Sequence, residues 1–472
     1  MHAIPSIVRR SVWVLPLVLG LVWVQWNGYE GLNGADSHDY FRVARAWSAW
    51  LHGAERPATA EHPPAFSLMG AVLGMATGDI LLALRCIPCV AFLLIGIVLL
   101  RLVPRQDQTG PASTAFVLLG IGTSPFLLRH ALVVMSDVPA AALVFIGFWG
   151  LVVWRERASA KWFLLAALAG ALAVAFRFAA VPILGGAACW LIWEKGVGRR
   201  EWMIRAGIVL GLLLVAGLFT FRPVWLAEQC TGTPIEHWSG MNLFRTEHHS
   251  DDGVLRYRVP NILYVVSIIV HPGFLPIGLL LLPFVRRVDF RTFGAGLAVF
   301  MLLAYLLFTA GLPFQNDRVM LMALPFVAYL FAPAFGRAWA WLGSKRIRPW
   351  LVVGAIAVVQ MGLFARAIHP FMRNARVEHE LAAGVREAGA RHVYTHGMGP
   401  ALENYCPGVE VTELWYGPID HFDHDALLMV HPGNLEEQWL GLHPHENWTR
   451  AQQQGLSRVL ERPDGWVMAR VK

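Results

Sequence analysis

The sequence predicts an α-helical integral membrane protein with a small water-soluble domain at its C-terminal end. Of its 472 residues, 56% are apolar and only 15% are charged, whereas soluble domains carry about 25% charged residues. The mean hydropathy is +0.49. The 20 Trp and 26 Phe residues suit a chain with many membrane–water interfaces, where aromatic rings are enriched. The basic residues behind the net charge of +7 cluster in short segments between apolar runs, so no nucleic-acid partner is implied.

The apolar runs are long enough for about eleven membrane-spanning helices, since a helix needs roughly 20 residues to cross the hydrocarbon core and about 17 suffice when neighbours help. These runs are 11–28, 79–100, 112–128, 138–154, 161–176, 178–194, 206–222, 261–284, 293–311, 319–335 and 350–368. The run from Pro64 to Thr77 is shorter and predicts an interfacial or re-entrant helix. No small-residue cleavage site follows the first run, which predicts an uncleaved first span.

Lysine and arginine set the expected orientation. If the N-terminus is cytoplasmic, the cytoplasmic segments hold the larger share of these residues, although the opposite segments are much longer. Loops retained in the cytoplasm show this bias. An odd number of spans then places the C-terminus outside. The expected membrane domain is 1–368, with external loops at 29–62 and 223–260, and an external soluble domain follows at 369–472.

The segment 369–472 has a polar composition in which predicted helices and strands alternate. Val377–Ala388 has the spacing of an amphipathic helix. His392–Thr395 and Ala426–Val430 have the composition of short strands, and Leu456–Val471 that of a hairpin around a Pro-Asp-Gly turn. This alternation predicts a small α/β domain.

The first external loop contains a stretch whose spacing predicts a surface helix that begins at Ser37. Its apolar face is formed by residues three and four apart, which are Tyr40, Val43, Ala44 and Trp47. Asp36 immediately precedes this helix, where a carboxylate is a favoured N-cap. Ionisable groups at a membrane mouth are also candidates for function, so capping and chemistry are both open for Asp36.

Four further polar side chains lie near the expected outer ends of the spans. Asp137 begins one span, either as a helix cap or as a functional carboxylate. His62 precedes two prolines and either binds an anion or lies among lipid headgroups. Arg177 and Arg318 either extend toward headgroups or bind a phosphate, whose geometry matches the fork of donors on a guanidinium.

The order of these motifs resembles that of the GT-C superfamily of polytopic glycosyltransferases, especially the bacterial branch with protein O-mannosyltransferase-like and aminoarabinose-transferase-like enzymes. The resemblance runs along roughly the first 340 residues. The matching motifs are Asp36, Tyr40 and Ala44 in the first loop, His62-Pro63-Pro64, Gly78-Asp79 to Leu84-Arg85, and Ser136-Asp137-Val138-Pro139. Many relatives carry two adjacent acids, whereas Asp36 and Asp39 are separated along this chain.

The resemblance implies transfer of a sugar from a polyprenyl-phosphate donor to a hydroxyl of an envelope lipid, glycan or protein, usually with inversion of the anomeric centre. It implies a location at the outer face of the bacterial cytoplasmic (inner) membrane, in contact with membrane lipids. By this resemblance Asp36 is the catalytic base, Asp137 its supporting carboxylate and Asp39 the alternative acid. The residues expected to bind substrate are Tyr40, His62, Arg85, Arg177 and Arg318. No cofactor is assigned, and the need for a divalent metal is open.

Transport is the rival function, because a carrier or flippase for lipid-linked sugars also has many spans and charges near the membrane. Carriers of this kind typically contain internal repeats with matching broken helices near mid-membrane, and the sequence shows no such pattern. A membrane scaffold whose external domain binds cell-wall material is a third interpretation. Loss of sugar transfer at an unchanged protein level separates an enzyme from both.

Overall fold

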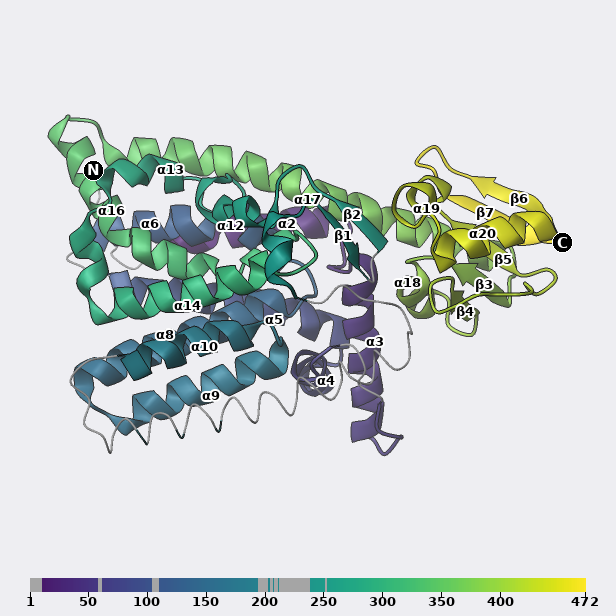
Figure 1. The fold of residues 1–472 in the computed structure, drawn as a ribbon, viewed down its shortest axis with the longest axis horizontal. Helices are drawn as coiled ribbons and strands as arrows, with labels where there is room; N and C mark the ends of the chain where they lie inside the picture. The colour runs from purple at the N-terminus through teal and green to yellow at the C-terminus, as the bar shows by residue number, and fades with distance from the viewer. Residues whose placement is uncertain are drawn as a thin grey trace.

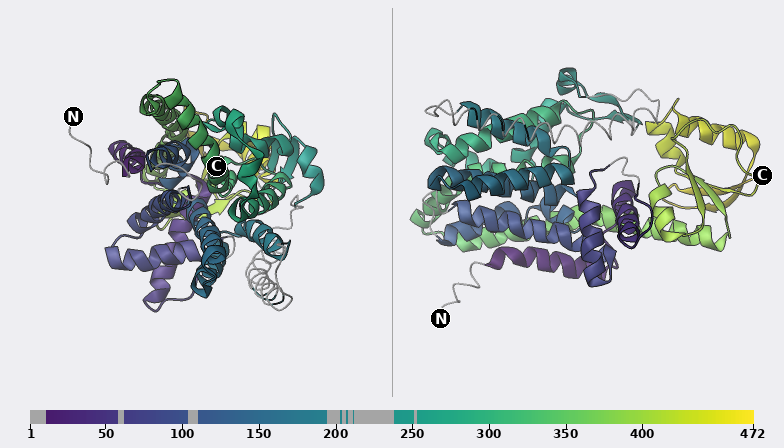
Figure 2. Two further views of the ribbon diagram at one scale, coloured as in Figure 1. Left: turned by 90° about the vertical axis from the view of Figure 1, so that its left-hand side faces the viewer. Right: turned by 90° about the horizontal axis from the view of Figure 1, so that it is seen from below.

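The computed structural model describes residues 11–57, 62–103, 110–193, 238–250 and 253–472, together with Met203, Gly207 and Gly211. Long helices lie side by side in a bundle, and a smaller domain of helices and strands lies at one end of that bundle (Figure 1). Seen from below, the bundle and the smaller domain again lie end to end (Figure 2, right). The prediction of a helical membrane protein with a small C-terminal α/β domain is confirmed. The predicted span 206–222 falls almost wholly outside the described residues.

The helices ahead of the C-terminal sheet mostly follow the predicted apolar runs, except for α3, which lies in the predicted first external loop. They are α2 (Leu15–Trp26), α3 (Gly34–Leu51), α4 (Ala65–Thr77), α5 (Ile80–Leu102), α6 (Gly110–Val117), α7 (Pro125–Ala131), α8 (Asp137–Arg157), α9 (Ala160–Phe176), α10 (Ala180–Trp193), α12 (Asn261–Val270), α13 (Gly278–Leu281), α14 (Phe293–Ala310), α15 (Asp317–Met320), α16 (Leu324–Ser344) and α17 (Pro349–Glu387). Short 3-10 helices occur at Val12–Val14, Gly240–Phe244, Leu282–Phe284 and Arg287–Arg291. The short apolar helix predicted after the two prolines is confirmed as α4.

Among the described residues, four helices are long and apolar enough to cross a membrane by themselves, namely α5, α8, α14 and α17. A fifth span results if the bent pair formed by α6 and α7 is one crossing. Large apolar side chains such as Leu94, Leu168 and Val358 stay exposed on the bundle, as expected where lipid is the surrounding medium. Phenylalanines such as Phe145 and Phe326 fill its interior. The chain is therefore a multi-pass membrane protein.

Two of the runs that were predicted as spans are broken, so neither is one straight helix. In 112–128 the helix axis bends by 67° after a single π-helical turn. Pro125 then begins a new helix, because proline has no N–H to donate to the preceding turn. In 261–284, α12 ends after 10 residues, and Pro272 and Pro276 lie in the turns before α13.

The surface helix α3 runs across the end of the bundle, next to the C-terminal domain (Figure 1). It begins at Gly34 and not at Ser37, and its N-cap is Asn33, so Asp36 lies within the first turn and the capping interpretation of Asp36 is wrong. Gly34 has a φ of +67°, a left-handed conformation that disfavours an L residue by about 1–2 kcal/mol. The predicted apolar face is confirmed by the buried side chains of Tyr40, Ala44 and Trp47.

The C-terminal domain is built on a sheet with the strand order β4-β3-β5-β7-β6. Strands β4, β3 and β5 are parallel, and β5, β7 and β6 are antiparallel. The strands are β3 (His392–Thr395), β4 (Glu410–Glu413), β5 (Leu427–Val430), β6 (Leu456–Glu461) and β7 (Val467–Val471), and the helices are α18 (Gly399–Tyr405), α19 (Pro432–Gln438) and α20 (His443–Gln454). The predicted strands at β3 and β5 and the predicted β6–β7 hairpin are confirmed.

The loop between β3 and α18 uses its backbone N–H groups within the domain. Gly397 and Gly399 donate hydrogen bonds to the Glu413 carboxylate at 2.9 and 2.6 Å. Burial raises the pKa of Glu413 to about 7. In nucleotide-binding α/β folds, the first strand–helix loop holds a phosphate. Here the carboxylate of Glu413 accepts the hydrogen bonds from the N–H groups that would otherwise face a phosphate.

Two features connect the C-terminal domain to the bundle. The helix α17 is one continuous helix of 39 residues, so the last predicted span and the predicted amphipathic helix at 377–388 belong to the same element. At 1.5 Å per residue its length is about 58 Å, well beyond a hydrocarbon core of about 30 Å. The hairpin of β1 (Glu247–Ser250) and β2 (Gly253–Arg256) lies in the predicted loop 223–260 and contacts α19.

Candidate active site

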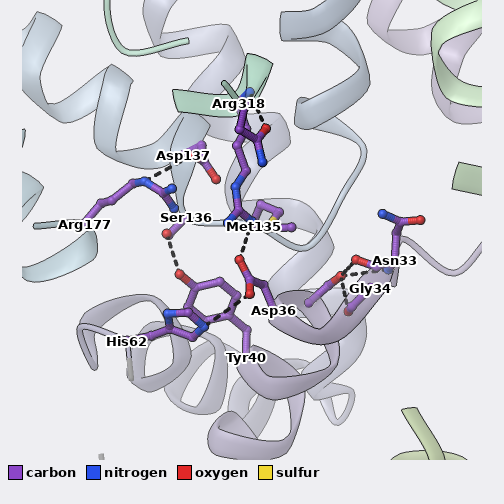
Figure 3. A network of polar contacts seen from close by, with 12 residues as sticks. Asn33, Gly34, Asp36, Tyr40, His62, Met135, Ser136, Asp137, Arg177 and Arg318 are labelled. Carbon is purple, nitrogen blue, oxygen red and sulfur yellow. Dashed lines mark hydrogen bonds and ion pairs between the residues drawn. The ribbon is translucent and has the colours of Figure 1, made fainter. Parts of the chain in front are cut away.

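Asp36 and Arg318 form an ion pair that joins two distant parts of the sequence. Helix α3 holds Asp36 in its first turn, and the short helix α15 holds Arg318. Nη1 of Arg318 donates a hydrogen bond to Oδ2 of Asp36 (Figure 3). The two side chains keep 25% and 27% of their surface exposed, so an incoming ligand can reach both.

Tyr40 and His62 pack beside this ion pair. Tyr40 lies one turn after Asp36 and therefore on the same face of α3. Its ring stacks on His62 with the centroids 4.7 Å apart, and Nε2 of His62 lies 3.8 Å from Oδ1 of Asp36. The hydroxyls of Tyr40 and Ser136 share a hydrogen bond of 2.8 Å. Burial raises the pKa of Tyr40 to about 12, so its phenol stays protonated at neutral pH.

Asp137 and Arg177 form a second charged pair in the same cluster (Figure 3). Asp137 is the first residue of α8, and Arg177 directly follows α9. Nε of Arg177 lies 3.1 Å from Oδ1 of Asp137, whose side chain is only 1% exposed. The N-cap of α8 is Ser136, so Asp137 is not the cap. Ser136 also bonds Tyr40, which ties this pair to Asp36.

Several buried polar atoms of this cluster have no hydrogen-bond partner within the described parts of the chain. They are both carboxylate oxygens of Asp137 and the Nε atoms of Arg177 and Arg318, although Oδ1 of Asp137 and Nε of Arg177 attract each other as an ion pair at 3.1 Å. An unpartnered buried polar group is unfavourable by about 1–3 kcal/mol, so such groups are few in native proteins. Their concentration at one place is what a site completed by a polar ligand requires.

Arg318 keeps the Asp36 carboxylate ionised. Burial alone would raise the pKa of Asp36, but the guanidinium of Arg318 and, next, the ring of His62 outweigh burial, so this pKa lies below its ordinary value. The carboxylate is therefore free of a proton at neutral pH. A base with a low pKa is a weak base, so Asp36 becomes more effective when Arg318 turns to another anion.

The structure does not bring Asp39 and Arg85 into this cluster. Asp39 accepts a hydrogen bond of 3.2 Å from Nε of Arg42, its neighbour one helical turn later. Arg85 donates to the side chain of Gln25 at 3.2 Å and to the Tyr29 carbonyl at 3.5 Å. The roles expected for Asp39 and Arg85 stay predictions, and their contacts offer no support for them.

A second group of buried charges adjoins Arg318 through the preceding residue. Asp317 accepts a hydrogen bond from Arg129, and Nε2 of His130 lies 3.5 Å from its carboxylate. The guanidinium carbon of Arg129 lies 4.5 Å from the ring centroid of Phe371 in α17. Sequence reasoning missed this group, and the position of Asp317 beside Arg318 is the one signal that indicates it.

The cluster around Asp36 does not fit a divalent cation. Its carboxylate faces the cation Arg318 on one oxygen and His62 on the other. In the portion of the chain that is described, no three His, Cys, Asp or Glu side chains are close enough to hold a metal ion. The metal dependence that the sequence left open stays untested.

The fold of the whole chain is similar to that of ArnT from Cupriavidus metallidurans. The apo structure of ArnT matches with a TM-score of 0.59 at 16% sequence identity, over 97% of each chain. The structure of ArnT bound to undecaprenyl phosphate matches with a TM-score of 0.60 at 15% identity, over 97% of this chain and 98% of ArnT. This chain has the GT-C fold of ArnT.

The ArnT-like fold confirms the fold that the GT-C resemblance implies. No family profile matches the sequence, and no curated protein matches it. The likeness to ArnT is thus one of fold alone.

Proposed function

We propose that this ArnT-like protein is a glycosyltransferase that moves a sugar from a polyprenyl-phosphate donor to a hydroxyl acceptor. The observation that carries the proposal is the meeting of the Asp36–Arg318 and Asp137–Arg177 pairs in one cluster with unpartnered polar atoms. Such a reaction needs cations for the leaving phosphate and a base for the acceptor. The binding of undecaprenyl phosphate by ArnT supports a lipid-phosphate donor.

Asp36 is the general base of the proposed reaction. The acceptor oxygen attacks the anomeric carbon of the sugar while Asp36 takes the hydroxyl proton. The bond between the anomeric carbon and the phosphate oxygen breaks, and the polyprenyl phosphate leaves with the electron pair of that bond. Attack on the face opposite the leaving group inverts the anomeric centre. The donor already carries an activated sugar, so no nucleotide takes part.

Arg318 and Arg177 bind the donor phosphate. A guanidinium presents a planar fork of donors to phosphate oxygens, and hydrogen bonds between ionised partners are the strong ones. When a phosphate oxygen binds Arg318, the guanidinium interacts with both the phosphate and Asp36. The pKa of Asp36 then rises toward its ordinary value. Asp137 orients Arg177 through their ion pair. Donor binding thus prepares the base.

The acceptor approaches from the end of the bundle that carries α3 and the C-terminal domain. The β1–β2 hairpin and α19 contact each other at this end, and we assign acceptor choice to these segments. The bias of Lys and Arg toward the opposite loops supports an outer-face location for this end. In a bacterial inner membrane, the acceptors within reach there are envelope lipids, glycans and proteins.

The test combines cells and purified protein. Envelope glycans and lipids from cells with and without the gene are compared chemically, and the sugar that is lost identifies the acceptor. Liposomes holding the purified protein are then supplied with the matching labelled polyprenyl-phosphate sugar and that acceptor. The expected result is transfer by the wild type and none by Asp36→Asn. Movement of the labelled lipid across the bilayer without transfer would contradict the proposal and support the rival transport function.

A further inference from the structure

The helix α3 presents a second polar group on the face opposite Asp36 and Tyr40. His38 is fully buried, and both of its ring nitrogens have partners from the C-terminal part of the chain. The Asn404 amide donates to Nδ1 at 3.2 Å and to the His38 carbonyl at 3.0 Å. Because Nδ1 accepts, the ring proton lies on Nε2, which donates to Oε2 of Glu378 at 3.0 Å.

Glu378 holds the start of α3 as well as His38. Its second carboxylate oxygen accepts a hydrogen bond of 3.3 Å from the backbone N–H of Gly34, the first residue of α3. The Glu378 side chain is only 8% exposed. Glu380 lies two residues further along the same helix α17, but its partner is Arg462 within the C-terminal domain. Of the two carboxylates, Glu378 is the one that contacts α3.

The C-terminal domain adds contacts to the same stretch of α3. Asn404 belongs to α18, and its neighbour Glu403 lies 3.3 Å from Nε of Arg42. The ring of Tyr405 packs edge-on against His38, with the centroids 5.2 Å apart. Three consecutive residues of α18, Glu403 to Tyr405, therefore contact α3. The contacted residues of α3, His38 and Arg42, lie two and six positions after Asp36.

The same long helix also supports the partner of Asp36. Phe371 of α17 packs on the guanidinium of Arg129, which bonds Asp317. Asp317 directly precedes Arg318. Helix α17 is thus connected to both members of the ion pair. The contact of Glu378 with His38 connects it to the helix that holds Asp36. The contacts of Phe371 with Arg129 and of Arg129 with Asp317 connect it to Arg318.

We infer that Glu378 is a positioning residue, and that α17 with the C-terminal domain sets the geometry between Asp36 and the donor phosphate through the contact of Glu378 and Asn404 with His38. This inference rests on the proposed function for its kinetic consequence and on the contacts above for its structural one. A displacement of about 1 Å at a reacting group lowers rate by as much as about 100-fold, so the position of α3 matters even though Glu378 touches no substrate.

The experiment uses full-length protein in liposomes and four variants. In Glu378→Gln one carboxylate oxygen becomes an NH2 donor, so only one of the two hydrogen bonds, from His38 or from Gly34, can persist. His38→Leu removes the imidazole altogether. His38→Gln keeps a donor near the position of Nε2, and Glu380→Gln removes a neighbouring carboxylate that does not touch α3. We expect kcat per folded molecule to fall about 10- to 100-fold in the first two, with the KM for donor nearly unchanged. The other two should stay close to wild type.

Hydrogen exchange of the α3 backbone provides a readout that does not need activity. Amides of α3 should exchange faster in Glu378→Gln and His38→Leu than in Glu380→Gln. Unchanged exchange in α3, or a loss limited to the amount of folded protein with kcat preserved, would overturn the inference. If the wild type transfers no sugar, the proposed function fails, while the exchange of α3 still decides whether Glu378 positions this helix.

Discussion

Two Arg–Asp pairs of the bundle differ in how fully their hydrogen bonds are satisfied. Arg337 donates from Nη1 to Asp289 at 2.9 Å and from Nη2 to the other carboxylate oxygen, and its Nε donates to the Phe284 carbonyl at 2.7 Å. Arg318 instead makes one hydrogen bond to Asp36 and one from the same Nη1 to Sδ of Met135 at 3.7 Å, and its Nε has no hydrogen-bond partner among the residues that the structure describes. Arg337 lies 13 positions after the first residue of α16. It is therefore about 20 Å along the helix from the end of α16 that follows α15.

The contrast separates a structural ion pair from one that is available to a ligand. In a bidentate pair such as Arg337 and Asp289, two parallel hydrogen bonds fix the geometry of the carboxylate. Replacing either partner should therefore mainly change the stability of the fold. A pair with free donors leaves buried polar atoms unsatisfied, and a phosphate can satisfy them. The pair of Asp289 and Arg337 is therefore the matched control for the pair of Asp36 and Arg318.

The largest expected effect is that of Asp36→Asn on transfer. A positioned general base contributes about 10²–10⁴-fold to rate, and Asn cannot take the acceptor proton. We expect a rate loss of that size, measured with labelled donor in liposomes, while donor binding persists. Asp289→Asn should keep its rate and lower the unfolding temperature. Near-normal transfer by Asp36→Asn would remove it as the base and make Asp39 the next candidate, whose Asn variant is otherwise expected to be milder.

Replacement of Arg177 tests the second pair of the cluster. Removing one electrostatic contact to a developing charge lowers kcat by about 100-fold or more, and we expect such a loss in Arg177→Gln. Arg337→Gln is its control, and its kcat per folded molecule should match the wild type. Equal kinetic losses in both variants would show that the contrast between the two pairs has no functional meaning.

The pH dependence of transfer tests whether donor binding frees Asp36 from Arg318. The kcat/KM profile reports the free enzyme and the kcat profile reports the complex. In the free protein Arg318 and His62 hold the pKa of Asp36 below its ordinary value, so kcat/KM should stay flat down to about pH 5. The acidic limb of kcat should lie at higher pH. If the acidic limbs of the kcat and kcat/KM profiles coincide, Arg318 is not shared between Asp36 and the donor phosphate.

The smallest expected effect concerns Glu413, a buried carboxylate whose two oxygens are both hydrogen-bonded. Its pKa is raised from 4.5 to about 7 by burial, so the folded state binds the proton more tightly than the unfolded state. Stability should therefore increase as pH falls from about 7 to about 4.5, which calorimetry can follow as a rising unfolding temperature. Glu413→Gln should flatten this trend without changing transfer. A kinetic defect in Glu413→Gln would contradict its structural role.

Local patterns were sufficient to predict most elements of the fold. Apolar runs gave the helices, and the period of Tyr40, Ala44 and Trp47 gave the buried face of α3. The breaks at Pro125 and after α12 were missed because apolar runs do not show where a buried helix turns. Asp36 and Asp137 were indicated by the motifs of the resemblance, and Arg177 and Arg318 by their positions near the outer ends of the spans.

The contacts that hold α3 and α15 in place beside the cluster could not be predicted from the sequence. His38 meets Glu378 across 340 positions, and no local spacing encodes a pairing of that range. The continuity of α17 was hidden because its polar half was interpreted as the start of a separate domain. Asp317 stood beside a chosen residue, but its partner Arg129 lies 188 positions away.

Direct binding of polyprenyl phosphate tests the central claim, namely that the unsatisfied pairs form a phosphate site. The purified wild type, Arg318→Gln and Arg337→Gln are titrated with the lipid phosphate in detergent or liposomes, and folding is checked for each. A hydrogen bond between charged groups contributes about 1.5–3 kcal/mol, so Arg318→Gln should bind about tenfold more weakly or worse. Arg337→Gln should bind like the wild type. Equal affinity of the wild type and Arg318→Gln would contradict the account.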